Sequence, residues 1–284
     1  MVRGHRIWLH AVEAGDPAGP RVLLLHGFPD GWRIWRYVLA PLAEAGCSVT
    51  ALDLRGYGLS DKPTHSHDYR LDALVADVRA VVGDQPVHLV GHDWGAQLAW
   101  HTAMRSPALI RSLTVLSLPH PAKIPAMASS GRQLLRSWYA GALTAISRSG
   151  TSLPPAATRM LVSTIDRNLQ RGRLSASDFD RHVAELSRPG VLPGILHYYR
   201  EMVERDPLRY RDDLARIEVP TRVIWGERDP FLGSCFAAPD PAWVPNQPGG
   251  VRRLNDAGHW PQLDEPDAVV EVLLESVRAD RAAH

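Results

Sequence analysis

The chain has 284 residues, of which 45% are hydrophobic and 22% are charged, and these values are ordinary for a soluble globular enzyme. The length allows one large domain, or one domain that carries a sizeable insertion. A formal net charge of +1 gives no reason to expect nucleic acid or an anionic membrane as a partner.

The first residues show no sign of a targeting segment. Residues 1–5 lead directly into strand-like sequence, without an apolar signal region. No apolar run reaches the ~18 residues of a membrane-spanning helix, so we expect a soluble, cytoplasmic protein. The two cysteines, Cys47 and Cys235, lie far apart in the sequence and are expected to stay reduced.

Patterns typical of strands and helices alternate along the first part of the chain. Residues 5–14 alternate between polar and apolar side chains, which is typical of an edge hairpin strand. Residues 22–25 form a continuous apolar run, which suits a strand buried on both faces of a parallel sheet. The alternation predicts a doubly wound parallel sheet. The other expected strands cover residues 48–52, 87–90 and 110–118, and the expected helices cover roughly residues 32–45, 71–82 and 96–104.

The alternation stops at Pro119-His120-Pro121, and the pattern from there to about residue 213 is helical, with Pro and Arg interruptions. The elements expected after it are strands at 221–225 and 251–254, a short helix with a loop within the Pro- and Gly-rich residues 236–250, and a closing helix at about 267–278. We therefore divide the chain into a first core part (1–119), a helical cap (120–212) and a second core part (213–284).

A short motif follows the expected strand at 87–90. Gly91-His92-Asp93-Trp94-Gly95 places Gly-x-Asp-x-Gly between a strand and a helix, which is the layout of a nucleophile elbow. A serine at the centre would indicate acyl transfer. A carboxylate is already ionised at neutral pH and needs no base to activate it. Asp93 therefore predicts displacement at a saturated carbon, with a covalent ester as the intermediate.

Two further polar residues follow strands, in the chain order that this kind of site uses for its acid and its histidine. Asp229 comes after the expected strand at 221–225, and His259 comes after the one at 251–254. Because ligands bind outside the carboxyl ends of parallel strands, Asp93, Asp229 and His259 are candidates for one cleft. His259 would deprotonate the water that cleaves the ester, and Asp229 would hold the imidazole in the required tautomer.

The ester carbonyl needs hydrogen-bond donors when water attacks it, because its oxygen then becomes an anion. The backbone N–H groups of Phe28 and Trp94 are the expected donors of this oxyanion hole. The Asp93 carboxylate would also lie at a helix N-terminus, which favours its anionic form.

Four motifs together resemble the α/β-hydrolase fold, and within it the epoxide hydrolase branch, which is related to the haloalkane dehalogenases. They are His26-Gly27-Phe28-Pro29, residues 53–63 (Asp-Leu-Arg-Gly-Tyr-Gly-Leu-Ser-Asp-Lys-Pro), Gly91-His92-Asp93-Trp94-Gly95 and Gly258-His259-Trp260. The likeness covers nearly the whole chain outside the cap. It implies a mostly parallel eight-stranded sheet flanked by helices, with an inserted helical cap, and a cis peptide bond between Phe28 and Pro29.

The resemblance also places two tyrosines in the cap, where they would stabilise the oxygen of an opening epoxide. Tyr199, in His197-Tyr198-Tyr199-Arg200, matches the second family position and keeps its Tyr-Arg pair. Tyr139, in Arg136-Ser137-Trp138-Tyr139, matches the first position, although the residues after it depart from the family pattern. Either tyrosine could instead be a core aromatic of the cap, and Tyr198 and Tyr210 are neighbouring alternatives.

The main alternative is a haloalkane dehalogenase that uses the same three residues. Trp94 would serve as a halide donor in either enzyme, whereas Phe28 stands where dehalogenases of this kind often carry Asn, and Phe has no side-chain donor. A hydrolase-fold binding protein without activity is a further alternative, because fold does not fix function.

The sequence therefore favours an epoxide hydrolase that forms a vicinal diol and needs no cofactor or metal. We expect a small-molecule epoxide as its partner, no nucleic acid, no stable membrane insertion, and a monomer or homodimer. Glu227 or Asp256 could replace Asp229 as the acid, and His26, His92 and His120 are expected to have structural roles.

Overall fold

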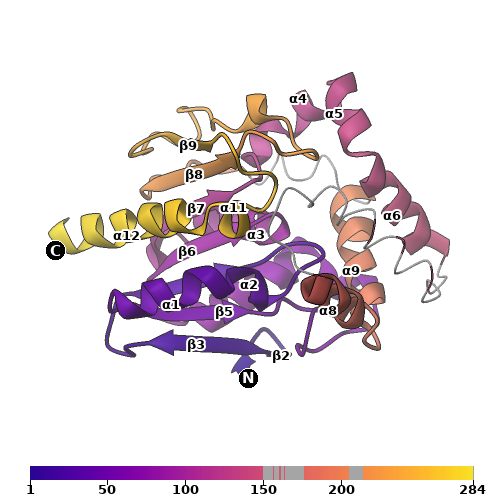
Figure 1. Cartoon of the computed structure of the whole chain (residues 1–284), viewed down its shortest axis with the longest axis horizontal. Coiled ribbons are helices and arrows are strands. Elements are labelled where there is room, and N and C mark those ends of the chain that lie inside the picture. Colours follow the sequence, from indigo (N-terminus) through magenta and orange to yellow (C-terminus); the bar gives the residue numbers. More distant parts are fainter. Residues whose placement is uncertain (150–155, 157–159, 161–162, 164–175, 205–213, 284) are drawn as a thin grey trace.

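The computed structural model of the chain describes residues 1–149, 176–204 and 214–283, together with the single positions 156, 160 and 163. Its centre is a seven-stranded sheet with the order β3-β5-β4-β6-β7-β8-β9 (Figure 1). β3 pairs with β5 in antiparallel fashion, and the other neighbouring pairs are parallel. The strands are β3 (Ala11–Gly15), β4 (Arg21–Leu25), β5 (Ser48–Leu52), β6 (Val87–His92), β7 (Ile110–Leu116), β8 (Thr221–Gly226) and β9 (Val251–Leu254).

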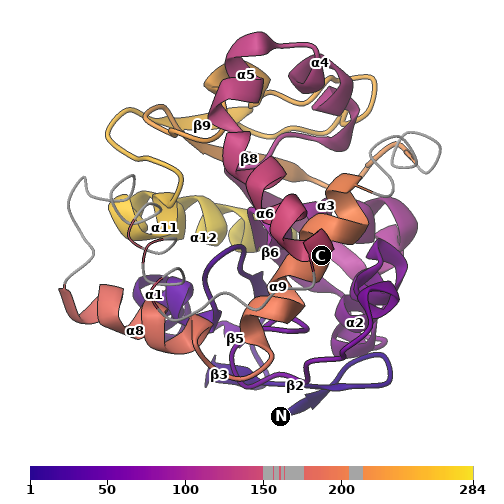
Figure 2. The same cartoon turned by 90° about the vertical axis from the view of Figure 1, so that its right-hand side faces the viewer.

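Helices cover both faces of the sheet, which explains why consecutive residues of β4 and β6 are buried, rather than every second one. Figure 2 shows α1, α11 and α12 on one side and α2 and α3 on the other. Trp35, Trp100 and Trp225 are among the largest fully buried side chains of this core. These helices are α1 (Arg36–Glu44), α2 (Leu71–Val82), α3 (Trp94–Arg105), α11 (Pro261–Asp264) and α12 (Pro266–Ala283), and a 3-10 turn, η1 (Trp32–Trp35), precedes α1.

The α/β architecture is confirmed, but the N-terminal segment differs from its prediction. Residues 5–14 do not form one edge strand, because Arg6 adopts a φ of +62° and the His10 N–H donates to Ser60 Oγ. The segment forms β2 (Trp8–Leu9), which pairs with β1 (Val2–Arg3) in a separate two-stranded sheet, and β3. The main sheet of the described residues therefore has seven strands instead of the expected eight.

Two shorter elements also differ from their predictions. The strand expected at 110–118 ends at Leu116, because Ser117 adopts a φ of +51°. In place of the helix expected within residues 236–250, the structure has a single 3-10 turn, η6 (Ser234–Phe236), that ends at the first residue of this segment. The closing helix was predicted in the right place but is longer than expected.

Cys47 and Cys235 are both free thiols.

The described residues between β7 and β8 are largely helical, and in Figure 1 these helices gather beyond the carboxyl ends of the parallel strands. Among the described helices, none is both long enough and apolar enough to cross a bilayer. The helical elements are η4 (Pro121–Lys123), α4 (Ile124–Ala128), α5 (Gly131–Arg136), α6 (Trp138–Ser149), α8 (Ala176–Leu186), α9 (Val191–Tyr199) and a short π-helix, η5 (Arg200–Glu204). The extent of the cap, 120–212, stays a prediction, since its expected end lies outside the described residues.

The start of α3 lies against β4 so closely that its second residue has no room for a side chain. A Cβ added at Gly95 would lie 2.3 Å from the carbonyl oxygen of Leu25 and 2.6 Å from that of His26. Both neighbours are backbone atoms of a buried strand end, so neither can move without shifting the strand. The glycine therefore fixes the distance between the helix and the sheet.

Gly95→Ala is expected to lower the free energy of unfolding by about 1–3 kcal/mol, since it overpacks this contact. Gly141→Ala is the matched control, because an added Cβ at this exposed position of α6 meets nothing within 4 Å. The control should raise the free energy of unfolding by about 0.5–1 kcal/mol, as expected for a helical glycine replaced by alanine. Chemical denaturation of the two variants measures both values, and equal effects would contradict the close contact.

Candidate active site

Asp93 lies at the turn between β6 and α3, in a backbone conformation that few residues adopt. Its φ is +52° and its ψ is −118°, and it stands immediately before the first residue of α3. A conformation of this kind costs of order 1–3 kcal/mol and persists only where the surrounding structure imposes it. The turn directs the carboxylate away from the sheet, as expected for a nucleophile elbow.

The loop after β4 holds one oxygen of this carboxylate. The Phe28 N–H donates to Asp93 Oδ1 at 2.8 Å, and the Phe28–Pro29 peptide bond is cis. A Cβ at Gly27 would lie 2.3 Å from the same oxygen, so only glycine allows the two loops to approach this closely. In the described part of the chain, the backbone N–H of Trp94 makes no hydrogen bond to the Asp93 carboxylate. The loop therefore supplies one of the two expected donors in this state.

Asp229 and His259 come from the loops after β8 and β9 and form a buried pair. The Nδ1–H of His259 donates to Asp229 Oδ2 at 2.7 Å, and the other oxygen of Asp229 accepts the N–H groups of Phe231 and Leu232 at 2.8 and 2.9 Å. The opposite ring nitrogen, Nε2, lies 3.6 Å from Asp93 Oδ2. The imidazole therefore bridges two carboxylates, as the predicted order of acid, histidine and nucleophile requires.

The charges of Asp93, His259 and Asp229 alter the pKa values of His259 and Asp93. Burial alone would lower the pKa of His259, but the carboxylates of Asp229 and Asp93 outweigh it and raise the pKa to about 10. Burial alone would raise the pKa of Asp93, but its hydrogen bond to His259 and the charge of that ring hold it below the ordinary value. At neutral pH the resting site thus holds an imidazolium between two carboxylates.

Both predicted tyrosines line the same pocket as Asp93 and Trp94, a cavity of about 230 Å³. Tyr199 ends α9, and its ring packs edge-on against Phe28 and Trp94. Tyr139, in the first turn of α6, packs edge-on against Phe231. Burial raises the pKa of each phenol, so both hydroxyl groups stay protonated and can donate hydrogen bonds.

The rest of this pocket is mainly apolar, with side chains of Leu118, Ile124, Met127, Met202 and Leu232 among its lining. A larger cavity, of about 490 Å³, lies between α8 and residues 29–36 and contains none of the five predicted catalytic side chains. The smaller cavity is the candidate active site, because it alone of the two reaches the Asp93 carboxylate.

Comparison with known proteins agrees with this geometry. A family model described as alpha/beta hydrolase fold matches residues 20–266. Epoxide hydrolase 4 of Mus musculus is 34% identical over 269 residues, which cover 92% of this chain and 73% of that protein. An AB hydrolase superfamily protein of Bacillus subtilis, YfhM, is 31% identical over 98% of this chain and 97% of its own length. A crystal structure of a mutant epoxide hydrolase from Bacillus megaterium superimposes with a TM-score of 0.84 at 30% identity, covering 98% of this chain and 99% of that one.

The chain belongs to the epoxide hydrolase branch of the α/β-hydrolase fold family. It is therefore a hydrolase, and the resemblance seen in its four sequence motifs is confirmed. The matched family segment includes Asp93, Asp229 and His259 as well as both cap tyrosines.

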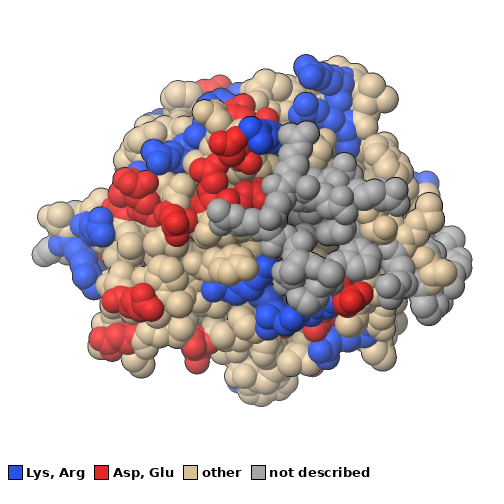
Figure 3. Space-filling view, in the orientation of Figure 1, with Lys and Arg blue, Asp and Glu red and all other residues tan. Residues whose placement is uncertain are grey.

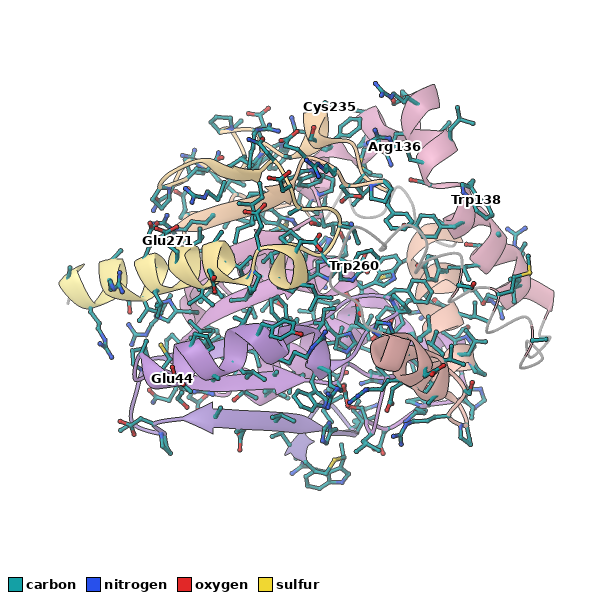
Figure 4. All side chains as sticks on the ribbon, in the orientation of Figure 1. Glu44, Arg136, Trp138, Cys235, Trp260 and Glu271 are labelled. Atoms are coloured by element: carbon teal, nitrogen blue, oxygen red, sulfur yellow. The ribbon has the colours of Figure 1, made fainter. Side chains whose placement is uncertain are left out.

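Two side chains that hold the site of this α/β-hydrolase, Asp30 and Trp260, were given no role from the sequence. Asp30, which follows the cis-Pro motif, accepts the indole N–H of Trp260 at 2.7 Å, and Trp260 packs edge-on against His259. Figure 4 shows Trp260 between α11 and the cap helices. His92 lies 2.8 Å, through Nε2, from the backbone carbonyl oxygen of His259. This contact suits the structural role expected of His92, whereas adjacency to the motifs was the available signal for Asp30 and Trp260.

The alternative residues have other partners. Glu227 pairs with Arg253, and Asp256 pairs with Arg228, so neither carboxylate is the one that holds His259. The hydroxyl group of Tyr198 donates to the carbonyl oxygen of Arg55 in the core. Tyr210 lies outside the described residues.

Two of the histidines expected to be structural have hydrogen bonds that suit such a role. The Leu54 N–H donates to His26 Nε2, and the Ala122 N–H donates to His120 Nδ1, which places His120 at the start of η4. Burial lowers the pKa of both, so each ring stays neutral at physiological pH and can accept such a bond.

The charge of His259 in the free α/β-hydrolase can be measured directly. NMR titration should give a pKa near 10 for His259, with the signal assigned by its loss in His259→Gln. Asp93→Asn should lower that pKa, because it removes one of the two carboxylates. The raised pKa stabilises the fold fully below the unfolded pKa of about 6.5, and this contribution is lost as the pH rises through about 10. A His259 pKa that Asp93→Asn leaves unchanged would contradict the coupling.

Proposed function

We propose that this protein hydrolyses an epoxide to a vicinal diol through a covalent ester on Asp93. The observation that carries the proposal is that the Asp93 carboxylate shares one small, mainly apolar pocket with two protonated tyrosines and has Nε2 of the Asp229-bound His259 3.6 Å from its Oδ2. The relatives named epoxide hydrolases, at 30–34% identity over nearly the whole chain, support the same activity.

In the first half-reaction, the Asp93 carboxylate attacks one carbon of the epoxide ring and forms an ester. The C–O bond of the ring breaks, and its electron pair stays on the epoxide oxygen. Tyr139 and Tyr199 donate hydrogen bonds to that oxygen, and a proton reaches it to complete a hydroxyl group. The backbone N–H of Phe28 donates a hydrogen bond to Asp93 Oδ1, so Oδ2 is the oxygen that attacks the carbon.

In the second half-reaction, water attacks the carbonyl carbon of the ester. His259 removes the proton of this water through Nε2, and Asp229 stabilises the imidazolium that forms. The Phe28 N–H already contacts the oxygen that becomes negative, and the Trp94 N–H is the proposed second donor. The intermediate then collapses as the bond between the acyl carbon and the alkyl oxygen breaks, and His259 returns its proton to the departing oxygen. The diol leaves with one oxygen of Asp93, the oxygen of water stays in the carboxyl group, and the proton of that group passes to His259, which restores the starting charges.

Alkylation also changes the charge state of His259. The pKa of about 10 depends in part on the negative charge of Asp93, and the ester has no such charge. The pKa of His259 therefore falls once the ester forms, and the imidazole can lose its proton to act as a base. The proton that His259 releases to solvent balances the one that the epoxide oxygen takes up.

The dehalogenase alternative uses the same nucleophile but has a leaving group that needs no proton. A pocket with two protonated phenols offers more to an alkoxide than to a halide, so the epoxide is favoured. A binding protein without activity is disfavoured, because all three triad positions carry the side chains that the two half-reactions need.

The covalent step can be trapped. His259→Gln should accept one equivalent of substrate and then stop, so intact-protein mass spectrometry after styrene oxide should show the added mass on Asp93. Asp93→Asn, freshly prepared, should show neither adduct nor turnover. In a single turnover of the native enzyme in ¹⁸O water, the label should enter Asp93 and be absent from the diol. A labelled diol in that first turnover would exclude the ester.

The tyrosines give a separate test. Tyr199→Phe and Tyr139→Phe should each lower kcat for styrene oxide by roughly tenfold to a hundredfold, because each removes a donor to the epoxide oxygen. Tyr198→Phe is the matched control, since its hydroxyl group bonds to Arg55 in the core. It should lower stability and leave kcat within about twofold. Halide release from haloalkanes that survives Tyr199→Phe, without diol formation, would favour the dehalogenase.

A further inference from the structure

Three large apolar side chains lie exposed where α5 ends and α6 begins. Leu134, Leu135 and Trp138 are 57%, 78% and 63% exposed, at the end of α5 and the start of α6. Figure 4 shows Trp138 at the outer edge of the molecule, near Arg136. Trp8, at 54%, is a comparably exposed indole in a different part of the chain, on the N-terminal hairpin. We call Leu134, Leu135 and Trp138 the cap patch.

The charge around the cap patch has one sign. Between residues 121 and 165 the sequence contains no Asp or Glu, and four of its basic residues are Lys123, Arg132, Arg136 and Arg148. Figure 3 shows Lys and Arg gathered over the tip that α4 and α5 form in Figure 1. A net charge of +1 for the whole chain hides this asymmetry, because the acidic residues lie elsewhere.

The cap patch is continuous with the wall of the catalytic pocket. Ser137 and Tyr139, the two neighbours of Trp138 in the chain, both line that pocket, and so does Ala140. One short segment therefore presents apolar side chains outward and pocket-lining side chains inward.

We infer that the cap patch is a docking surface for an anionic lipid bilayer. A helical surface that combines leucines and a tryptophan with arginines is suited to the lipid interface, where apolar side chains enter the acyl boundary and basic ones meet the headgroups. Because the segment of the patch also forms the pocket wall, a docked enzyme faces the phase in which apolar epoxides dissolve.

A second copy of the chain fits the cap patch less well than a bilayer does. A two-fold interface brings the same surface of both copies together, so Arg132 and Arg136 would face their own equivalents. Like charges at such an interface oppose association, whereas an anionic headgroup layer neutralises them. The charge of the patch therefore favours the bilayer.

Vesicle co-sedimentation tests this inference, and it needs no turnover, so its result is separate from that of the proposed function. The native protein should partition into phosphatidylcholine vesicles that contain ~30% phosphatidylglycerol, and much less into phosphatidylcholine alone. A combined Leu135→Asn and Trp138→Ser variant should lose the partitioning by on the order of tenfold. Arg132→Gln with Arg136→Gln should lower it for the anionic vesicles only.

Two matched variants keep the test specific. Trp8→Ser removes an exposed indole outside the patch, and Arg79→Gln removes an exposed arginine of α2, so both should partition like the native protein. A circular dichroism melting curve for each variant reports that it is folded. Equal sedimentation with and without anionic vesicles would overturn the inference. So would a native dimer, seen by light scattering, that Trp138→Ser converts to monomer.

Discussion

An imidazolium held between the buried carboxylate of Asp229 and the half-buried carboxylate of Asp93 is the interaction on which the rest of this site depends. Asp229 is fixed by two backbone N–H groups, so it cannot follow His259 if the ring moves. Asp93 is fixed by a strained turn and by the Phe28 N–H, so its negative charge has one position. The ring between them is therefore charged as long as both carboxylates are, and the charge of Asp93 helps to set the protonation of His259.

The alternation of strands and helices and the order of the chemical residues could be predicted from the sequence. Parallel strands buried on both faces leave long apolar runs, and turns at their carboxyl ends leave short motifs rich in glycine, so Asp93, Asp229 and His259 could be assigned to one cleft. The broken edge strand at residues 5–14 could not be predicted, because the break depends on His10 bonding to Ser60, a residue 50 positions away. Long-range partners of this kind have no local pattern.

The cap also has features that no local sequence pattern predicts. Its helices could be expected from composition, but the inward direction of Tyr139 and the outward direction of Trp138, one residue earlier, depend on how α6 lies over the pocket. Whole-chain charge was equally uninformative, because opposite charges in different parts of the molecule cancel. Side-chain direction and local charge are properties of the packed cap, and both determine what reaches Asp93.

The hydrogen bond between Asp30 and Trp260 joins residues 230 positions apart in the chain. It brings the loop that carries the Phe28 N–H together with the loop that carries His259, so the two sides of the site come from opposite ends of the polypeptide. During synthesis the N-terminal part emerges first, and it cannot complete the site until the last strand and helix have left the ribosome. Bringing such distant segments together has a high entropic cost, so the reactive carboxylate gains its partner late in folding. In a truncated or unfinished chain, Asp93 would thus lack the histidine that it contacts in the folded protein.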